Sequence, residues 1–89
     1  MASTPITIVN KLGLHARAAA KFVTLASQFQ SEIQLVRGSR TVNGKSIMAV
    51  MLLAASKGTE LVLIADGDDE ASAITALTDL VANKFGEGE

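Results

Sequence analysis

The chain has 89 residues and a formal net charge of −1, with 48% hydrophobic residues, one histidine and no cysteine. This length predicts one domain over residues 1–89, which is too small to build a second lobe around a large substrate. The near-neutral charge and the lack of Trp and Tyr disfavour nucleic-acid binding, and the absence of cysteine excludes disulfides and thiolate chemistry.

The first half of the chain predicts a strand, a helix and a hairpin. Residues 4–9 are rich in β-branched side chains, which favours a strand. Residues 16–27 carry apolar side chains at helical spacing, which predicts a helix with one buried face made of Ala19, Phe22, Val23 and Ala26. Residues 32–37 and 40–42 flank the turn residues Gly38-Ser39, which predicts two paired strands.

The second half predicts a short helix, a strand and a last helix. Residues 47–55 are apolar, with Ser46 at the N-cap position and Lys57-Gly58 expected to close the helix. Residues 60–65 predict a strand. Asp69 and Glu70 open the last helix, where negative charge suits the helix dipole. Its expected buried face consists of Ile74, Leu77, Val81 and Phe85, and residues 86–89 are expected to form a frayed tail.

The order of these elements, β-α-β-β-α-β-α, predicts the fold class. It is typical of an α+β open-faced sandwich, with the helices on one face of a small four-stranded antiparallel sheet. The sequence shows no internal repeat and no linker that would divide the chain.

The only histidine, His15, lies after a turn that contains Gly13, where the first helix is expected to begin. A helix start leaves the N–H groups of Ala16, Arg17 and Ala18 without intrahelical partners and carries about half a positive charge. A phosphoryl group on His15 would therefore meet waiting donors, and the forked guanidinium of Arg17 suits phosphate oxygens. The alternative is a histidine that only packs or caps.

The second helix carries apolar side chains on almost all of its surface. A domain of this size can bury only one side of it, so part of that surface is expected to stay exposed. We interpret Ile47, Met48 and Met51 as a partner-docking patch, because methionine adapts to different surfaces. Ordinary core packing is the alternative. For Ser46, the alternative to a regulatory role is a plain N-cap.

Four segments together carry a family resemblance: Gly13-Leu14-His15-Ala16-Arg17, Gly44-Lys45-Ser46-Ile47-Met48, Lys57-Gly58 and Asp69-Glu70. In this order and spacing, they resemble HPr, the histidine-containing phosphocarrier family of the bacterial phosphoenolpyruvate-dependent phosphotransferase system. The resemblance implies that His15 takes a phosphoryl group on its pros nitrogen from phosphorylated enzyme I and passes it to an enzyme IIA domain, with Arg17 assisting. It also implies that Ser46 resembles the serine modified by HPr kinase/phosphorylase. The chain departs from the pattern at Ala18, where many relatives carry proline.

Other classes of function are less well supported by the sequence. There is no Walker-type loop, and one histidine without cysteine argues against a metal or cofactor site. The uncharged runs, such as residues 47–56, are too short to span a bilayer, and the first residues lack the pattern of an export signal. We therefore expect a cytoplasmic monomer without membrane insertion. The main alternative is a regulatory module on the same scaffold, whose phosphorylation state controls partner proteins rather than sugar uptake.

Overall fold

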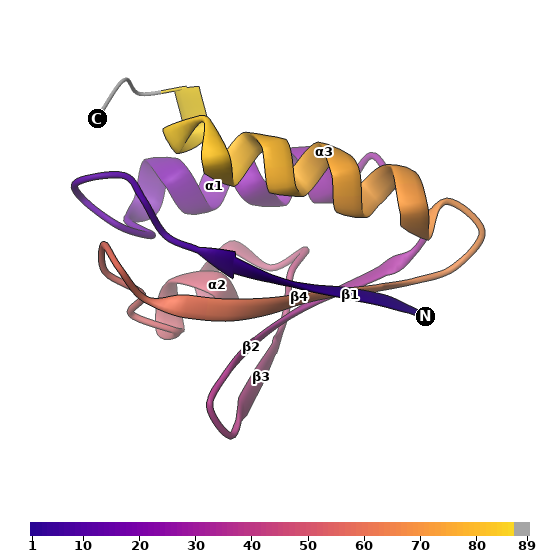
Figure 1. The fold of residues 1–89 in the computed structure, drawn as a ribbon, viewed down its shortest axis with the longest axis horizontal. Helices are drawn as coiled ribbons and strands as arrows, with labels where there is room; N and C mark the ends of the chain where they lie inside the picture. The colour runs from indigo at the N-terminus through magenta and orange to yellow at the C-terminus, as the bar shows by residue number, and fades with distance from the viewer. Residues whose placement is uncertain (87–89) are drawn as a thin grey trace.

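The computed structural model describes residues 1–86 and confirms the predicted order of elements (Figure 1). The strands are β1 (Ala2–Thr7), β2 (Glu32–Arg37), β3 (Arg40–Asn43) and β4 (Glu60–Asp66). The helices are α1 (Ala16–Ala26), α2 (Ile47–Leu52) and α3 (Glu70–Ala82), and a 3-10 turn, η1 (Lys84–Gly86), follows. Gly86, expected in the tail, belongs to this turn, and the rest of the predicted tail, residues 87–89, lies outside the described residues.

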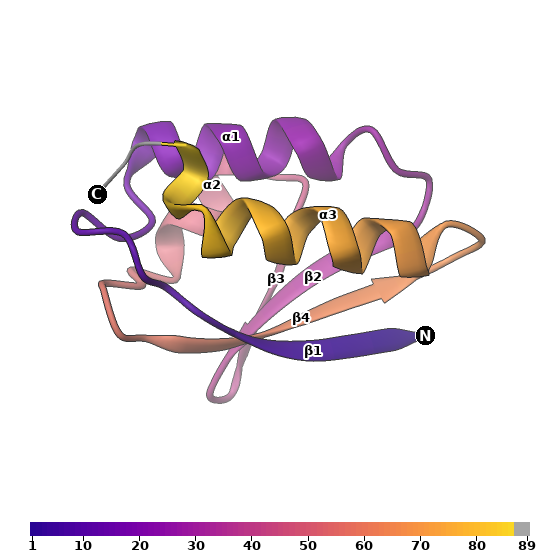
Figure 2. The ribbon, with the colours of Figure 1, turned by 45° about the horizontal axis from the view of Figure 1, so that its top comes forward.

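The sheet is antiparallel, with the strand order β1-β4-β2-β3. Val62 of β4 pairs with Pro5 of β1 on one side and with Val36 of β2 on the other. Helices α1 and α3 lie side by side over one face of the sheet (Figure 2). Because side chains alternate along a strand, Leu61 and Leu63 are buried under the helices, whereas Val62 faces the uncovered side. The open-faced α+β sandwich is therefore confirmed.

The core fills the space between the helices and the covered face of the sheet. The predicted face of α1 is buried in full, and Phe22 is 1% exposed. Leu77, Val81 and Phe85 are buried as expected, whereas Ile74 is only half-buried at the edge of the core. Each large apolar side chain removed from water contributes about 1.5–3 kcal/mol. Among the helices of residues 1–86, none has the length and apolar character needed to cross a membrane.

Three predicted boundaries differ from the structure by two residues or more. Strand β1 begins at Ala2 rather than at Thr4. Strand β1 ends at Thr7 rather than at Val9, and beyond it the Ile8 N–H donates to the Thr59 carbonyl at 2.9 Å, ahead of β4. Helix α2 ends at Leu52 rather than Ala55, because Ala54 adopts a left-handed conformation with φ of 51°. The expected closure at Lys57-Gly58 is therefore incorrect, and these residues instead form the turn before β4.

Asp69 precedes α3 as expected, but its carboxylate does not cap that helix. It reaches across to the segment between α1 and β2, where it accepts the N–H groups of Gln30 at 2.9 Å and Ser31 at 3.0 Å, as well as the Ser31 hydroxyl. These hydrogen bonds, first that of the Ser31 hydroxyl and then that of the Gln30 N–H, lower the pKa of Asp69. Asp69 therefore joins the start of α3 to the start of β2.

This bridge predicts an acid-sensitive contribution to stability. Because folding lowers the pKa of Asp69, its contribution is present above the unfolded-state pKa of about 3.9 and is lost as pH falls through the folded value. We expect Asp69→Asn to lower the melting temperature at pH 6, and this loss to shrink progressively as pH falls below about 3.9 toward the lowered folded-state pKa. Thermal unfolding followed by circular dichroism across this pH range measures the trend. Asp68→Asn, at an exposed neighbour, is the control, and equal losses for both variants would contradict the bridge.

Candidate functional site

The turn before α1 is closed by Asn10, whose side chain is fully buried. The side-chain Nδ2 of Asn10 donates to the Gly13 carbonyl at 2.8 Å, and the backbone carbonyl of Asn10 accepts the Gly13 N–H at 3.2 Å. Gly13 has a φ of 71°, and a Cβ there would lie 2.5 Å from the Ala55 carbonyl oxygen. The next residue, Leu14, donates its N–H to that same oxygen at 2.8 Å. A residue without a Cβ is therefore required for the turn to lie against the segment that follows α2.

His15 is the N-cap residue of α1, with an extended backbone and a half-buried side chain. Its carbonyl accepts the N–H of Ala19 at 2.8 Å, which is the first backbone hydrogen bond of the helix. The imidazole does not cap the N–H groups of the described first turn. The N–H groups of Ala16 and Arg17 precede that first hydrogen bond and belong to exposed residues. A group carried by His15 at this helix end would therefore be near backbone donors that the helix itself does not use.

Of the three backbone donors predicted for the anion site, Ala18 differs from the other two in its burial. Ala18 is fully buried, so its N–H is not accessible to a group that reaches the helix end from solvent, and Ala16 and Arg17 remain as the backbone candidates. The Arg17 side chain is exposed. The first turn of α1, which lies within the described residues, carries no acidic side chain that would weaken the positive end of the helix dipole. This helix end thus favours an anion.

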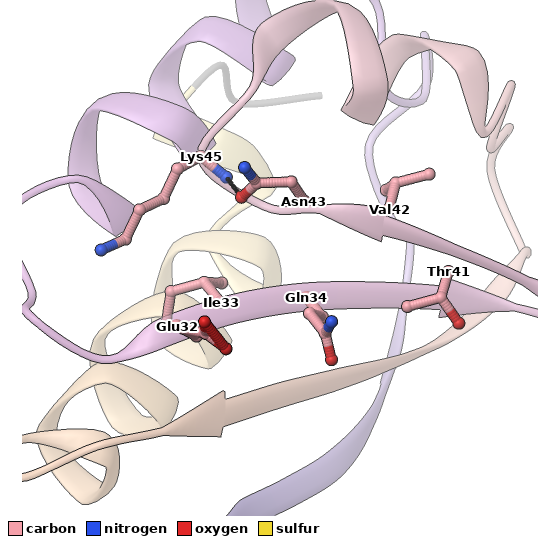
Figure 3. A pocket seen from close by; sticks show the side chains of 7 residues that line it. All are labelled: Glu32, Ile33, Gln34, Thr41, Val42, Asn43 and Lys45. Atoms are coloured by element: carbon pink, nitrogen blue, oxygen red, sulfur yellow. Dashed lines mark hydrogen bonds between the residues drawn. The ribbon is translucent and has the colours of Figure 1, made fainter.

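Ser46 is the N-cap residue of α2, as predicted, and its Oγ accepts the Ala49 N–H at 3.3 Å. The preceding turn is held by Asn43, whose Oδ1 accepts the Lys45 N–H at 2.9 Å (Figure 3). The Lys45 ammonium donates to the Phe29 carbonyl at 2.7 Å, beyond the end of α1. Asn43 and Lys45 also border a hollow of about 350 Å³, whose other lining residues are Glu32, Ile33, Gln34, Thr41 and Val42. The capping role of Ser46 is confirmed.

The residues predicted to form the docking patch are exposed. The exposed fractions are 42% for Ile47, 76% for Met48 and 41% for Met51, whereas the core side of α2 is formed by Val50 and Leu53. Leu52, at 65%, extends the exposed apolar surface of α2, and the His15 turn adds Leu12 at 67%. Neither leucine was predicted as a site residue, although both are apolar and lie in short segments that cannot be fully covered.

Helix α2 contacts α1, and the His15 turn contacts the segment that follows α2 through the hydrogen bond from Leu14 to Ala55. Ser46 lies at the opposite end of the same helix. A six-residue helix is about 9 Å long, so α2 separates Ser46 from the segment that the His15 turn contacts. The structure therefore connects the His15 turn to the residues after α2, and places Ser46 at the start of that helix.

Three polar residues that support this region were not identified from the sequence. Asn10 closes the His15 turn, and Arg37 and Arg40 bind carbonyl groups near the end of α2. A polar residue just before a glycine turn was the only signal for Asn10. The sequence offered no signal for the two arginines, because their partners lie 12 to 17 positions away along the chain.

The chain is similar to known proteins over almost its whole length. A family model described as "PTS HPr component phosphorylation site" matches residues 2–83. The chain is similar to a phosphocarrier protein HPr of Neisseria meningitidis serogroup A, with 57% identity over 89 residues and all of both chains covered. It is 53% identical over 90 residues to one of Pseudomonas aeruginosa, again with full coverage. A solved structure of HPr from Thermoanaerobacter tengcongensis has a TM-score of 0.94 and 52% identity, covering 98% of each chain.

Proposed function

Because this chain belongs to the PTS HPr family, we propose that it accepts a phosphoryl group on His15 from phosphorylated enzyme I and passes it to an enzyme IIA domain. The observation that supports this most is the position of His15, a half-buried residue at the N-cap of α1, directly before Ala16 and Arg17 in the first turn. The carrier acts as a single domain in the cytoplasm.

The transfer needs little from the carrier beyond position and charge. The lone pair of the pros nitrogen, Nδ1 of His15, attacks phosphorus, and the bond from phosphorus to the donor group of enzyme I breaks with its electron pair staying on that group. Phosphoryl transfer passes through a loose transition state, so donors that stabilise the equatorial oxygens suffice. The N–H groups of Ala16 and Arg17 and the guanidinium of Arg17 supply them. In the onward step, a nucleophile of enzyme IIA attacks phosphorus and the bond from phosphorus to Nδ1 breaks, with its electron pair returning to the His15 ring. The phosphorylated ring must therefore stay accessible to a second protein.

The experiment that tests this proposal follows one phosphoryl group through two proteins. The chain is incubated with enzyme I and phosphoenolpyruvate, purified, and then mixed with an enzyme IIA domain, with mass spectrometry of both proteins at each stage. We expect one phosphoryl group on His15 that moves to the enzyme IIA domain. A chain that is never modified would contradict the proposal. A chain that is modified at His15 but never discharges to any enzyme IIA domain would favour the regulatory module instead.

Docking of both partners is proposed for Ile47, Met48 and Met51, the exposed residues of α2, which packs against α1. We expect Met48→Glu to weaken enzyme I binding about tenfold, because a charge at the contact must be desolvated. Since Met48 is 76% exposed, the free energy of unfolding should change by less than about 0.5 kcal/mol. Titration calorimetry and urea unfolding measure the two effects. Val62→Glu, on the uncovered face of the sheet, is the control, and equal affinities for the two variants would contradict the patch.

Regulation through Ser46 by an HPr kinase/phosphorylase is proposed at the other end of α2. A phosphoryl group there would add about 1.5 to 2 negative charges next to the patch, which repels acidic partners and hydrates an apolar contact. We expect Ser46→Asp to slow phosphoryl acceptance at His15 about fivefold, as measured with enzyme I and phosphoenolpyruvate. Ser46→Asn is the matched control, since asparagine also caps helices but carries no charge. Equal rates for the two variants would remove the regulatory role.

A further inference from the structure

The His15 turn rests on a segment that is not itself part of a helix or strand. Leu14, directly before His15, donates its N–H to the Ala55 carbonyl at 2.8 Å. Ala55 follows Ala54, whose φ of 51° is disfavoured for any residue that has a Cβ. The position of the Ala55 carbonyl, which accepts the Leu14 N–H, therefore depends on a strained backbone conformation at Ala54 that other residues must stabilise.

Arg37, at the end of β2, supplies that support. Its Nη1 donates to the Leu53 carbonyl at 2.6 Å and to the Ala54 carbonyl at 3.1 Å, the two carbonyls that precede Ala55. The neighbouring Arg40 also binds this region, but its Nη1 donates to the Leu52 carbonyl at 2.6 Å, within α2. Both side chains are cations near the end of a helix, and only Arg37 binds the left-handed residue itself.

We propose that Arg37 is a positioning residue for His15, acting through Ala54, Ala55 and Leu14. This inference rests on the proposed phosphocarrier function. Without Arg37, the left-handed turn at Ala54 loses its two charge-assisted hydrogen bonds, and the Ala55 carbonyl is free to move away from Leu14. The start of α1 then samples several positions, so the donors of Ala16 and Arg17 are no longer fixed relative to the ring. The rate of transfer inside the docked complex falls, whereas docking itself is preserved.

The test compares Arg37→Ala with Arg40→Ala, which removes the same charge from the same hairpin. Hydrogen exchange of the Leu14 amide, followed by NMR, reports on the turn without any phosphoryl group. We expect this amide to exchange about tenfold faster in Arg37→Ala than in Arg40→Ala. With phosphorylated enzyme I as the donor, we expect kcat for phosphoryl acceptance to fall about tenfold in Arg37→Ala while KM stays equal to that of Arg40→Ala. Arg37→Lys, which keeps the charge and can reach one carbonyl, should give intermediate values.

A double variant separates positioning from loss of charge. Glycine adopts a φ of 51° without support, so Ala54→Gly added to Arg37→Ala should restore slow exchange of Leu14 and most of kcat. The inference is overturned if Arg37→Ala matches Arg40→Ala in Leu14 exchange or in kcat, or if Ala54→Gly restores neither. Failure of the proposed function has a different signature, since the wild-type chain would then show no acceptance while the exchange of Leu14 still differs between the two arginine variants.

Discussion

Replacement of His15 by alanine is expected to abolish phosphorylation by enzyme I and phosphoenolpyruvate, with a loss of about 10³-fold or more. The reason is chemical, since the ring nitrogen is the nucleophile and the backbone donors alone form no bond to phosphorus. The wild-type label should be labile in acid and stable in alkali, as a phosphoramidate is. Radiolabelled phosphoenolpyruvate followed by gel autoradiography measures the effect.

The fold should survive this substitution. The imidazole does not cap the first turn of α1, and the residue is half-buried at the surface, so circular dichroism and the melting temperature should remain close to those of the wild type. Ser46→Ala is the companion variant and should keep full labelling at His15. Undiminished labelling of a folded His15→Ala chain would show that another residue accepts the phosphoryl group.

Gly13→Ala is expected to cause the largest loss of stability among the site residues, about 2–5 kcal/mol. A left-handed backbone costs a residue with a Cβ about 1–2 kcal/mol, and the new atom would lie 2.5 Å from the Ala55 oxygen and 2.9 Å from the Ser56 Cα. Because both neighbours are backbone atoms, the turn must move away from the segment after α2. Urea unfolding gives the change in free energy.

Gly38→Ala provides the matched control for this prediction. Gly38 has a similar φ of 59°, but a Cβ there meets nothing within 4 Å. It should therefore show only the conformational cost of about 1–2 kcal/mol. Equal losses for the two variants would mean that the turn and the Ala55 segment are not packed as closely as the structure has them.

Local pattern was sufficient to predict much of this fold. The spacing of Ala19, Phe22, Val23 and Ala26 predicted the buried face of α1, and a serine before an apolar run predicted the Ser46 cap. These features depend on contacts within one element, which periodicity and capping preferences describe directly. Exposure of the α2 patch followed from the small size of the domain, which has too little core to cover the helix.

The parts that the sequence did not predict depend on residues far apart in the chain. Helix α2 stops at Leu52 and Ala54 is left-handed, with its carbonyl bound by the distant Arg37, whereas alanine by itself favours continuing the helix. Asp69 binds Gln30 and Ser31 rather than its own helix for a similar reason. Hydrogen bonds that connect separate elements leave no periodic signal, so the support of the His15 turn became visible only in three dimensions.

The proposed transfer depends on binding of the phosphoryl group by the backbone N–H groups that follow His15. NMR of the amide protons tests this binding most directly. Proton–nitrogen spectra are recorded for the unmodified chain and for the chain phosphorylated by enzyme I and phosphoenolpyruvate. We expect the amide protons of Ala16 and Arg17 to move downfield by more than any others, because each forms a charge-assisted hydrogen bond to the phosphoryl oxygens. If those two amides keep their positions while His15 carries the phosphoryl group, the helix end does not bind it and the account is contradicted.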